Sequence, residues 1–313
     1  MRLYLLLPLV FTMGCNAIKT SNLPSRADQL LTDAKTLSSD AYEGRKTGTP
    51  GADKAAAYIK NRFAEIGLRS FPLLPGYLQP FSFQGIDDPK INGKNVIGYI
   101  PGRSEKIIVI SAHYDHLGVI NGKIFNGADD NASGVAGMLK IAAHYAQNKP
   151  NYTLVFAAFD AEEFQRKGSY HFVSHLPFKL SRIKMNINLD MISHNDQGEL
   201  YAAGTFKYPQ LKKFIATTNP DLKILFGHDN PKLMIDDWTD QSDQSAFNAH
   251  NIPFIYFGVE DHKDYHKASD KFENLNQQFF INAAGAILEI TDNFDKDRTA
   301  ESVFRQNLKS EIN

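Results

Sequence analysis

The chain has 313 residues, of which 42% are hydrophobic and 22% charged, and its formal net charge at pH 7 is −1. This length suits one large domain or two average ones, and the composition is that of a globular protein. The near-zero charge argues against a nucleic-acid partner, and the lack of a Walker loop or GxGxxG turn argues against phosphate binding. The single cysteine, Cys15, excludes intramolecular disulfides, thiolate metal clusters and a cysteine nucleophile inside the fold.

Residues 1–15 have the pattern of a bacterial signal peptide. Arg2 precedes an apolar stretch, 3–13, that is too short for a membrane-spanning helix of about 20 residues. Cys15 stands where a lipoprotein signal is cut and acylated, and the alternative is an ordinary signal cleaved nearby. We expect a tether over 16–26 and a place in the envelope of a Gram-negative bacterium. There the protein is either lipid-anchored, on the periplasmic side of the outer membrane, or periplasmic or secreted, and a lipid on Cys15 is its only expected membrane contact.

The rest of the chain alternates helical patterns with short hydrophobic runs typical of strands. The expected helices cover 27–39, 51–68, 131–147, 164–175 and 276–292, and the expected strands cover 95–100, 106–112, 152–159, 185–189 and 253–257. A Pro- and Gly-rich loop is expected at 72–93 and a polar tail at 294–313. Strands buried on both faces and separated by helices indicate one α/β domain over 27–293, a three-layer αβα sandwich with a mixed, mostly parallel sheet.

Acidic and imidazole side chains follow four of these strands. The clusters are "HYDH" at 113–116, "DAEE" at 160–163, "DM" at 190–191 and, after a loop, "DYH" at 264–266. In open α/β sheets, ligands bind beyond the carboxyl ends of the strands. A further loop, "GADDNASG", places Asp129 beside Asp130 just before a helical pattern.

Each cluster has an ordinary explanation when taken alone. Asp129 or Asp130 can cap the helix that follows, the paired glutamates suit a first helical turn, and histidines are common at the surface. The spacing of a calcium-binding loop is not met. The conjunction of two histidines with several carboxylates, however, is a ligand set for two divalent metals, with zinc preferred.

Taken together, "SAHYDHLG", "GADDNASGVAGMLKIA", "AFDAEEFQRKGS", "NLDM", "SDQSAF…NIPFIYF" and "DYHKASD" resemble the secreted two-zinc aminopeptidases of metallopeptidase family 28. The segment "LSSDAYEGRKTGTPGADKAAAYIKNRFAEIGL" is similar to the lead-in of bacterial members. The resemblance runs from about residue 30 to residue 292. It implies the zinc-exopeptidase fold, a peptide substrate and two Zn²⁺ ions per chain.

Carried over by position, the resemblance implies five metal ligands. His113 and Asp190 would bind one zinc ion, and Glu163 and His266 would bind the other. Asp129 would bridge both ions.

The resemblance also implies catalytic roles. Glu162 would be the general base, because it precedes a ligand and would lie near an activated water. Asp115, two residues after His113, would accept the other N–H of that imidazole. Tyr265 matches a tyrosine that donates to the oxyanion in some relatives, and an aromatic residue that only packs near the site is an equal alternative.

Several other features complete this interpretation. The peptide bond between Asp129 and Asp130 is expected to be cis. Gln244 stands where relatives commonly have histidine, and the Gly-Leu that usually follows the paired glutamates is missing. We treat His116 and His194 as non-ligands.

The leading functional hypothesis is an exopeptidase that releases N-terminal residues from peptides. A carboxypeptidase is an alternative, since Arg166 and Lys167 could hold a terminal carboxylate. A glutaminyl-cyclase-like acyltransferase with one zinc and a non-catalytic binding member are the others. Because protonation of His113 and His266 competes with metal, activity should fall below neutral pH.

Overall fold

The computed structural model describes residues 26–85 and 90–297. The predicted signal peptide with Cys15, the tether up to residue 25 and the tail beyond residue 297 lie outside these residues, and what was expected of them stays a prediction. None of the helices in the described part of the chain has the length and hydrophobicity needed to cross a membrane.

The described residues form the helices and strands that the sequence patterns indicate, together with several short elements that the patterns did not predict. The α-helices are α1 (Arg26–Leu37), α2 (Pro50–Ile66), α3 (Gly134–Gln147), α4 (Lys167–Ser174), α5 (Gln244–Asn248) and α6 (Gln277–Lys296). The strands are β1 (Leu78–Phe83), β2 (Ile91–Ile100), β3 (Ile107–His113), β4 (Gly118–Ile120), β5 (Lys123–Phe125), β6 (Thr153–Phe159), β7 (Ile183–Leu189), β8 (Glu199–Ala203), β9 (Lys223–Leu225) and β10 (Phe254–Gly258).

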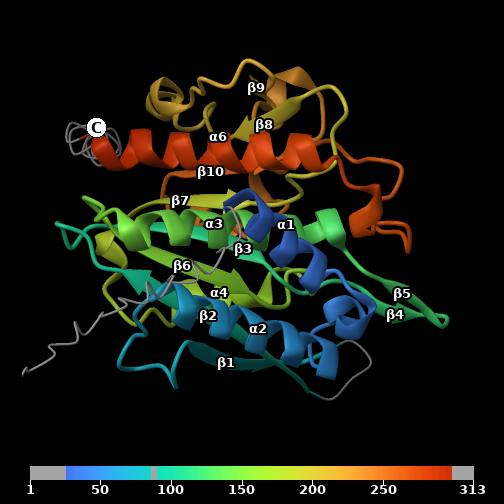
Figure 1. The fold of residues 1–313 in the computed structure, drawn as a ribbon. Coiled ribbons are helices and arrows are strands. Elements are labelled where there is room, and N and C mark those ends of the chain that lie inside the picture. The colour runs from blue at the N-terminus through green and yellow to red at the C-terminus, as the bar shows by residue number, and fades with distance from the viewer. Residues whose placement is uncertain (1–25, 86–89, 298–313) are drawn as a thin grey trace, which may run out of the picture.

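Eight strands form one sheet in the order β1-β2-β6-β3-β7-β10-β8-β9, and β4 pairs with β5 in a separate hairpin (Figure 1). The four central strands β6, β3, β7 and β10 are parallel, so their carboxyl ends meet at one edge. Strand β1 pairs antiparallel with β2, and β2 pairs antiparallel with β6. On the other side of the sheet, β8 pairs antiparallel with β10. The expected mixed, mostly parallel sheet is confirmed.

Helices cover both faces of this sheet. In β3, Ile108 and Ile110 contact the core under α1, α2, α3 and α6, whereas Ile107 and Val109 contact the core under α4 and α5. Successive residues of a strand point to opposite faces, so this alternation shows that β3 is buried between two helical layers. The expected αβα sandwich is confirmed, and Figure 1 shows α1, α2, α3 and α6 on the near side of the sheet.

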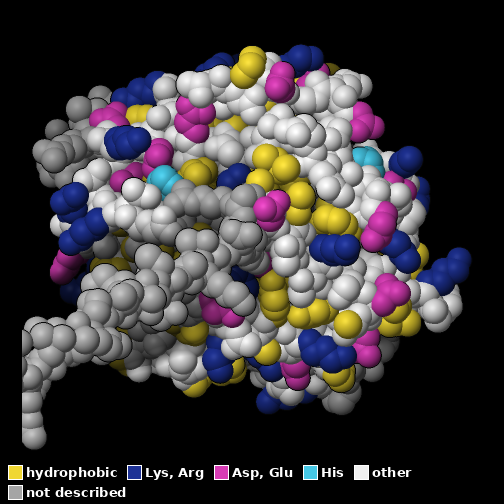
Figure 2. Space-filling view, viewed as in Figure 1, with side chains coloured by type: hydrophobic (Ala, Val, Ile, Leu, Met, Phe, Trp, Pro, Cys, Tyr) yellow, Lys and Arg dark blue, Asp and Glu magenta, His cyan; other side chains and the backbone are white. Residues whose placement is uncertain are grey.

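The surface above these four helices carries charges of both signs. Figure 2 shows lysine and arginine side chains interspersed with acidic ones on this face, in keeping with the small net charge of the chain. No large single-sign field is evident on the side that the figure shows.

Some boundaries differ from the sequence-based prediction. The expected loop 72–93 contains strand β1 and the beginning of β2. Proline is tolerated in β1, which includes Pro80, because β1 is an edge strand. The last helix continues to Lys296, past the expected domain end at residue 293, because Phe294 is buried in the core.

Candidate metal centre and active site

Side chains from several distant segments converge at the carboxyl edge of the central strands. His113 is the last residue of β3, Asp190 follows β7, and Glu162 and Glu163 lie in the turn after β6. His266 comes from the loop after β10. Because these strands are parallel neighbours, the five side chains lie close together although they are distant in sequence. They line one cavity of about 90 Å³.

Two groups of donor atoms share one carboxylate in this cavity. In the first, His113 Nε2 lies 3.2 Å from Asp190 Oδ1 and 3.3 Å from Asp130 Oδ1. In the second, His266 Nε2 lies 3.1 Å from Asp130 Oδ2 and 3.7 Å from Glu163 Oε1. The two oxygens of Asp130 therefore face different groups, and each group has nitrogen and oxygen donors suited to a divalent metal.

Asp129 does not occupy the bridging place that the sequence analysis gave it. One of its oxygens accepts hydrogen bonds from the backbone N–H and the hydroxyl of Ser193, both at 2.7 Å. The other oxygen lies 3.0 Å from His262 Nε2. The neighbouring aspartates point to opposite sides of the turn Ala128–Ser133, and the shared residue is Asp130.

The cis peptide bond is likewise one residue later than expected. It joins Asp130 to Asn131, not Asp129 to Asp130. The backbone N–H groups of both aspartates donate to the buried carboxylate of Asp270, at 2.9 and 3.1 Å. Asp270, which the sequence analysis did not single out, thus holds the turn beneath the donor groups.

A search of family models matches residues 95–291 to peptidase family M28, a segment that contains all the residues of both donor groups. The chain belongs to peptidase family M28. The prediction of a peptide-bond-hydrolysing enzyme is confirmed at this level.

Two bacterial relatives show how the similarity is distributed. The uncharacterized protein YfbL of Escherichia coli K12 is 24% identical over 92% of this chain and 95% of its own length. Aminopeptidase YwaD of Bacillus subtilis is 37% identical over 114 residues, which are 34% of this chain and 24% of that protein.

Solved structures share the fold of this M28 chain. The aminopeptidase from Aneurinibacillus sp. strain AM-1 superposes with a TM-score of 0.68, at 16% identity, over 85% of this chain and 93% of that one. The glutaminyl cyclase of Bacteroides thetaiotaomicron gives a TM-score of 0.69 at 18% identity, over 86% and 98% of the two chains. The same fold thus carries different activities.

Asp115 contacts both the His113 ring and the turn that carries Glu162 and Glu163. His113 Nδ1 lies 3.2 Å from the backbone carbonyl oxygen of Asp115 and 3.8 Å from its carboxylate. That carboxylate accepts the backbone N–H groups of Glu162 and Glu163 at 3.0 and 3.3 Å. The hydrogen bond expected from the imidazole goes to the carbonyl, and the carboxylate holds the turn that presents both glutamates. Burial raises the pKa of Asp115 well above its usual range.

Glu162 lies in the same cavity as the donor groups. Burial raises its pKa well above that of an ordinary carboxyl, the charge of His113 opposes the shift, and the charge of Asp243 adds to it. Asp243 is fully buried, and burial raises its pKa to about 6. A buried carboxyl with a raised pKa beside a ligand set is suited to accept and return a proton.

Tyr265 lines the cavity and packs on His266, with ring centroids 4.0 Å apart. Burial raises the pKa of the phenol, so it stays a hydrogen-bond donor at neutral pH. Gln244, by contrast, is buried behind the site, where its amide accepts from Asn188 and donates to the Trp238 carbonyl. Its replacement of a histidine changes a structural contact and removes no donor from the cavity.

The two histidines treated as non-ligands lie in different places. His116 Nδ1 is 2.9 Å from Glu163 Oε1 and 3.5 Å from Asp130 Oδ2, within the second donor group. Burial lowers the pKa of His116 to about 3, so the imidazole is neutral. His194 instead stacks on His262 at 3.8 Å and lies near Asp264, on the Asp129 side of the turn.

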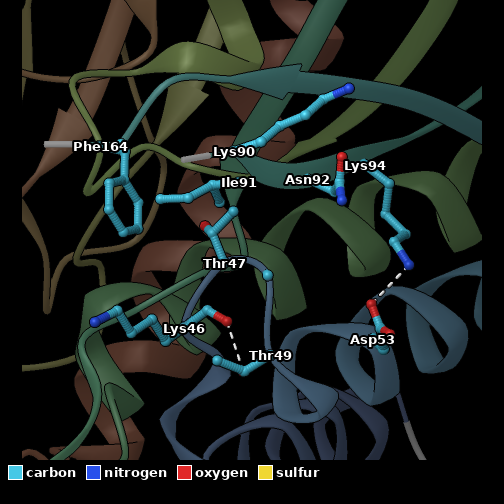
Figure 3. A pocket seen from close by; sticks show the side chains of 11 residues that line it. Lys46, Thr47, Thr49, Asp53, Lys90, Ile91, Asn92, Lys94 and Phe164 are labelled. Carbon is cyan, nitrogen blue, oxygen red and sulfur yellow. Dashed lines mark hydrogen bonds and ion pairs between the residues drawn. The ribbon is translucent and has the colours of Figure 1, made fainter. Parts of the chain in front are cut away.

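A larger cavity, of about 780 Å³, lies beside the turn 46–49 (Figure 3). Its lining in the described part of the chain includes no histidine, and its one carboxylate, Asp53, pairs with Lys94 at 2.6 Å. This cavity therefore lacks the set of nitrogen and oxygen donors that the smaller one has.

Proposed function

We propose that this M28 peptidase is an aminopeptidase that works with two Zn²⁺ ions. The observation that carries the proposal is the position of Asp130, whose two oxygens lie within 3.3 Å of histidine nitrogens in two different donor groups. His113, Asp190 and Asp130 would hold one ion, and Glu163, His266 and Asp130 the other. Nitrogen and carboxylate donors at these spacings fit zinc.

Charge supports the fit. The proposed ligands place three carboxylates and two imidazoles in one small cavity, which Glu162 and Asp261 also line. Burial raises the pKa of Glu163, although the charges of His113 and His266 oppose the shift. Such a concentration of carboxylates is unfavourable without a compensating cation. Two dications would offset the three negative charges and leave one positive charge.

The chain's own residues would then carry the reaction. Zinc, when bound, supplies Lewis acidity that polarises the scissile carbonyl and acidifies a water molecule. Glu162 would take the proton from this water and later give it to the leaving amine. The Tyr265 hydroxyl would donate a hydrogen bond to the carbonyl oxygen as negative charge develops there.

The cavity lining favours a substrate with a free α-ammonium group. Asp261 lines the cavity with Glu162, and the lining includes no lysine or arginine among the described residues. Arg166, the cation that kept a carboxypeptidase in consideration, donates instead to the backbone carbonyl of Asp240. A terminal carboxylate would find no lysine or arginine in this lining, whereas an ammonium would find the carboxylates of Glu162 and Asp261.

Trp238, Tyr256, Val259 and Met191 form the apolar part of the lining. They would surround the side chain of the first substrate residue. We therefore expect large apolar N-terminal residues to be preferred over acidic ones.

The test counts metal and measures turnover on one preparation. The purified protein would be assayed on aminoacyl-anilides, on the same compounds N-acetylated, and on N-terminal glutaminyl peptides. Two zinc ions and cleavage of free-amine substrates alone would support the proposal. One zinc ion with ammonia release from glutaminyl peptides would assign the protein to the cyclase activity instead, and metal with no turnover on any compound would contradict both.

We further propose that the mature chain begins at Cys15, acylated there, and faces the periplasm. The support is the sequence of residues 1–15, and relatives of this chain occur in bacteria. Labelling of the wild type with a radioactive fatty acid, and no labelling of Cys15→Ser, would support a lipid anchor. Equal labelling of both, or none of either, would contradict it.

A further inference from the structure

His116 lies inside the second donor group, although neither the family ligand set nor our sequence analysis includes it. The side chain is 1% exposed and comes from the segment just after β3. Its Nδ1 atom is 2.9 Å from Glu163 Oε1 and 3.5 Å from Asp130 Oδ2. These are the same two oxygens that face His266 Nε2, at 3.7 and 3.1 Å.

The four nitrogen-to-oxygen distances match four of the six edges of a coordination tetrahedron. Zinc bound to nitrogen or oxygen at about 2.0–2.1 Å has tetrahedral ligand-to-ligand edges of about 3.3 Å. The distances of 2.9, 3.1, 3.5 and 3.7 Å scatter evenly around this value. Each of the two nitrogens therefore lies at a ligand-to-ligand spacing from the same two carboxylate oxygens.

The His116 ring is held in this orientation by its surroundings. Its backbone N–H donates to the carbonyl of Arg45, a buried residue that also binds the carbonyls of Tyr114 and Gly127. The ring packs against Gly127 so closely that a Cβ atom there would lie 2.6 Å from it. Its Nε2 atom has no hydrogen-bond partner among the described residues, and Nδ1 is the nitrogen that faces Asp130 and Glu163.

The first donor group is built differently. His113, Asp190 and Asp130 supply its three donors. At the second site, His116 forms the corresponding set with Asp130 and Glu163, and His266 adds contacts with the same two carboxylates. Zinc sites with four protein ligands are closed, whereas catalytic sites keep a position for water or substrate.

We propose that His116 Nδ1 is a fourth protein ligand of the second metal ion. The proposal rests on the two-metal function proposed above and makes its two sites unequal. The second ion is held in a closed N₂O₂ site and anchors Asp130 and Glu163. With three protein donors, His113, Asp190 and Asp130 would leave the first ion a position for water or substrate.

A different role for His116 would give different results when residue 116 is changed. If its Nδ1–H only donated to Glu163, an asparagine would replace it, because its amide N–H₂ occupies the same place along the side chain. A cysteine could not donate comparably, but its thiolate is a zinc and cobalt ligand, and the longer metal–sulfur bond of about 2.3 Å compensates for the shorter side chain.

The test uses cobalt, whose visible and near-ultraviolet absorption reports its ligands. Two equivalents of Co²⁺ would be added to the metal-free wild type, His116→Cys, His116→Asn and Val119→Cys. The last variant places a thiol on the exposed strand β4, close by in sequence and outside the site. A thiolate-to-cobalt charge-transfer band is expected in His116→Cys alone.

Zinc competition with a chromophoric chelator provides the second measurement. We expect His116→Asn to weaken one of the two zinc ions by about tenfold or more and to leave the other unchanged. A missing charge-transfer band in His116→Cys together with wild-type zinc affinity in His116→Asn would overturn the inference. The number of zinc ions in the wild type tests the proposed function independently of His116. Two ions would support that function even if the inference about His116 failed, and fewer than two would contradict it.

Discussion

Asp129 and Asp130 are chemically identical neighbours with different partners. Asp130 lies between His113 and His266, whereas Asp129 is bound by Ser193 and His262. The carboxylate of Asp130 is thus shared by two donor groups, whereas that of Asp129, one residue earlier, stabilises the turn.

This difference predicts unequal effects of matched substitutions. We expect Asp130→Asn to lose both zinc ions at concentrations that saturate the wild type, because it removes a charge from both sites. Asp129→Asn keeps a hydrogen-bond acceptor for Ser193 and should retain two ions. Zinc counted after gel filtration checks this, and equal loss in the two variants would contradict the placement of Asp130.

Glu162 is expected to affect turnover and not metal. Replacing it with glutamine removes the proton acceptor while preserving shape, so kcat should fall by about 10²–10⁴-fold. Bound zinc should be unchanged, because Glu162 belongs to neither donor group. Steady-state rates and metal content on the same sample provide the check. Loss of zinc in Glu162→Gln would place this residue among the ligands instead.

The two histidines that we propose as metal ligands predict a pH dependence. Burial disfavours the imidazolium of His113, but the charge and hydrogen bond of Asp190, together with the charges of Glu162 and Asp130, outweigh burial and raise the pKa of His113 well above its usual value. Burial also lowers the pKa of His266, but the hydrogen bond and charge of Asp130, together with the charge of Glu163, outweigh burial and raise this pKa. A protonated imidazole cannot bind metal, so zinc affinity should begin to fall as pH drops through these raised values, above pH 6.5.

Because one proton competes with each ion, each zinc binding constant should fall by about tenfold per pH unit at low pH. The product of the two constants should therefore fall by about 100-fold per pH unit. Chelator competition between pH 5 and pH 9, with kcat/KM measured in parallel, tests this. Unchanged metal content down to pH 5 would contradict the assignment of His113 and His266.

At the scale of elements, the turn after β6 determines where both glutamates point. Helix α4 was expected from residue 164 but begins at Lys167, and Ala161, Gln165 and Arg166 have positive φ angles. Asn95 on β2 accepts the N–H of Asp160 and donates to the carbonyl of Gly168, which joins the two ends of this turn.

This arrangement depends on the close approach of the backbone at Gly168 to the backbone at Asp160. A Cβ atom at Gly168 would lie 2.0 Å from the backbone oxygen of Asp160. We expect Gly168→Ala to destabilise the protein by about 1–3 kcal/mol, because backbone must move to make room. Gly285, in helix α6 with nothing within 4 Å of such an atom, is the matched control.

Gly285→Ala should instead stabilise by about 0.5–1 kcal/mol, because alanine is the better helix former. Denaturant unfolding of both variants, in the presence of zinc, measures the two changes. A Gly168→Ala protein as stable as the wild type would show that the turn can relax without cost.

For the whole molecule, metal and pH should act on stability together. Burial raises the pKa of Glu162 and Glu163, and raises that of Asp270 to about 7. For each carboxyl the contribution to stability is fully present below its unfolded pKa near 4 and is lost as pH rises through the raised value. His116, with a lowered pKa, acts in the opposite direction but is outnumbered.

The metal-free protein should therefore melt at a higher temperature at pH 5.5 than at pH 7.5. The zinc-loaded protein should show the reverse order, because zinc binds the folded state and binds it better as pH rises. Calorimetry of both forms at the two pH values provides the check. The same order in both forms would mean that the buried carboxyls do not dominate the stability of the metal-free state.

The sequence by itself determined the sandwich, because uninterrupted hydrophobic runs such as that of β3 can only be buried between two layers. It also placed His113, Glu163 and Asp190 at one edge, since each follows a strand and parallel strands end together. Strand β1 was missed because Pro80 and the glycines around it resemble a loop, and its pairing at the sheet edge is a long-range contact.

Only the tertiary structure decided which aspartate is shared and where His116 lies. Asp129 and Asp130 have the same chemistry and nearly the same local context, so the choice depends on Ser193, His262, His113 and His266, all distant in sequence. His116 follows a strand as an ordinary surface histidine would, and only its contacts with Glu163 and Asp130 place it among the donors. The chain encodes the ligand types locally, but the directions of their side chains are set by contacts that form when the whole domain packs.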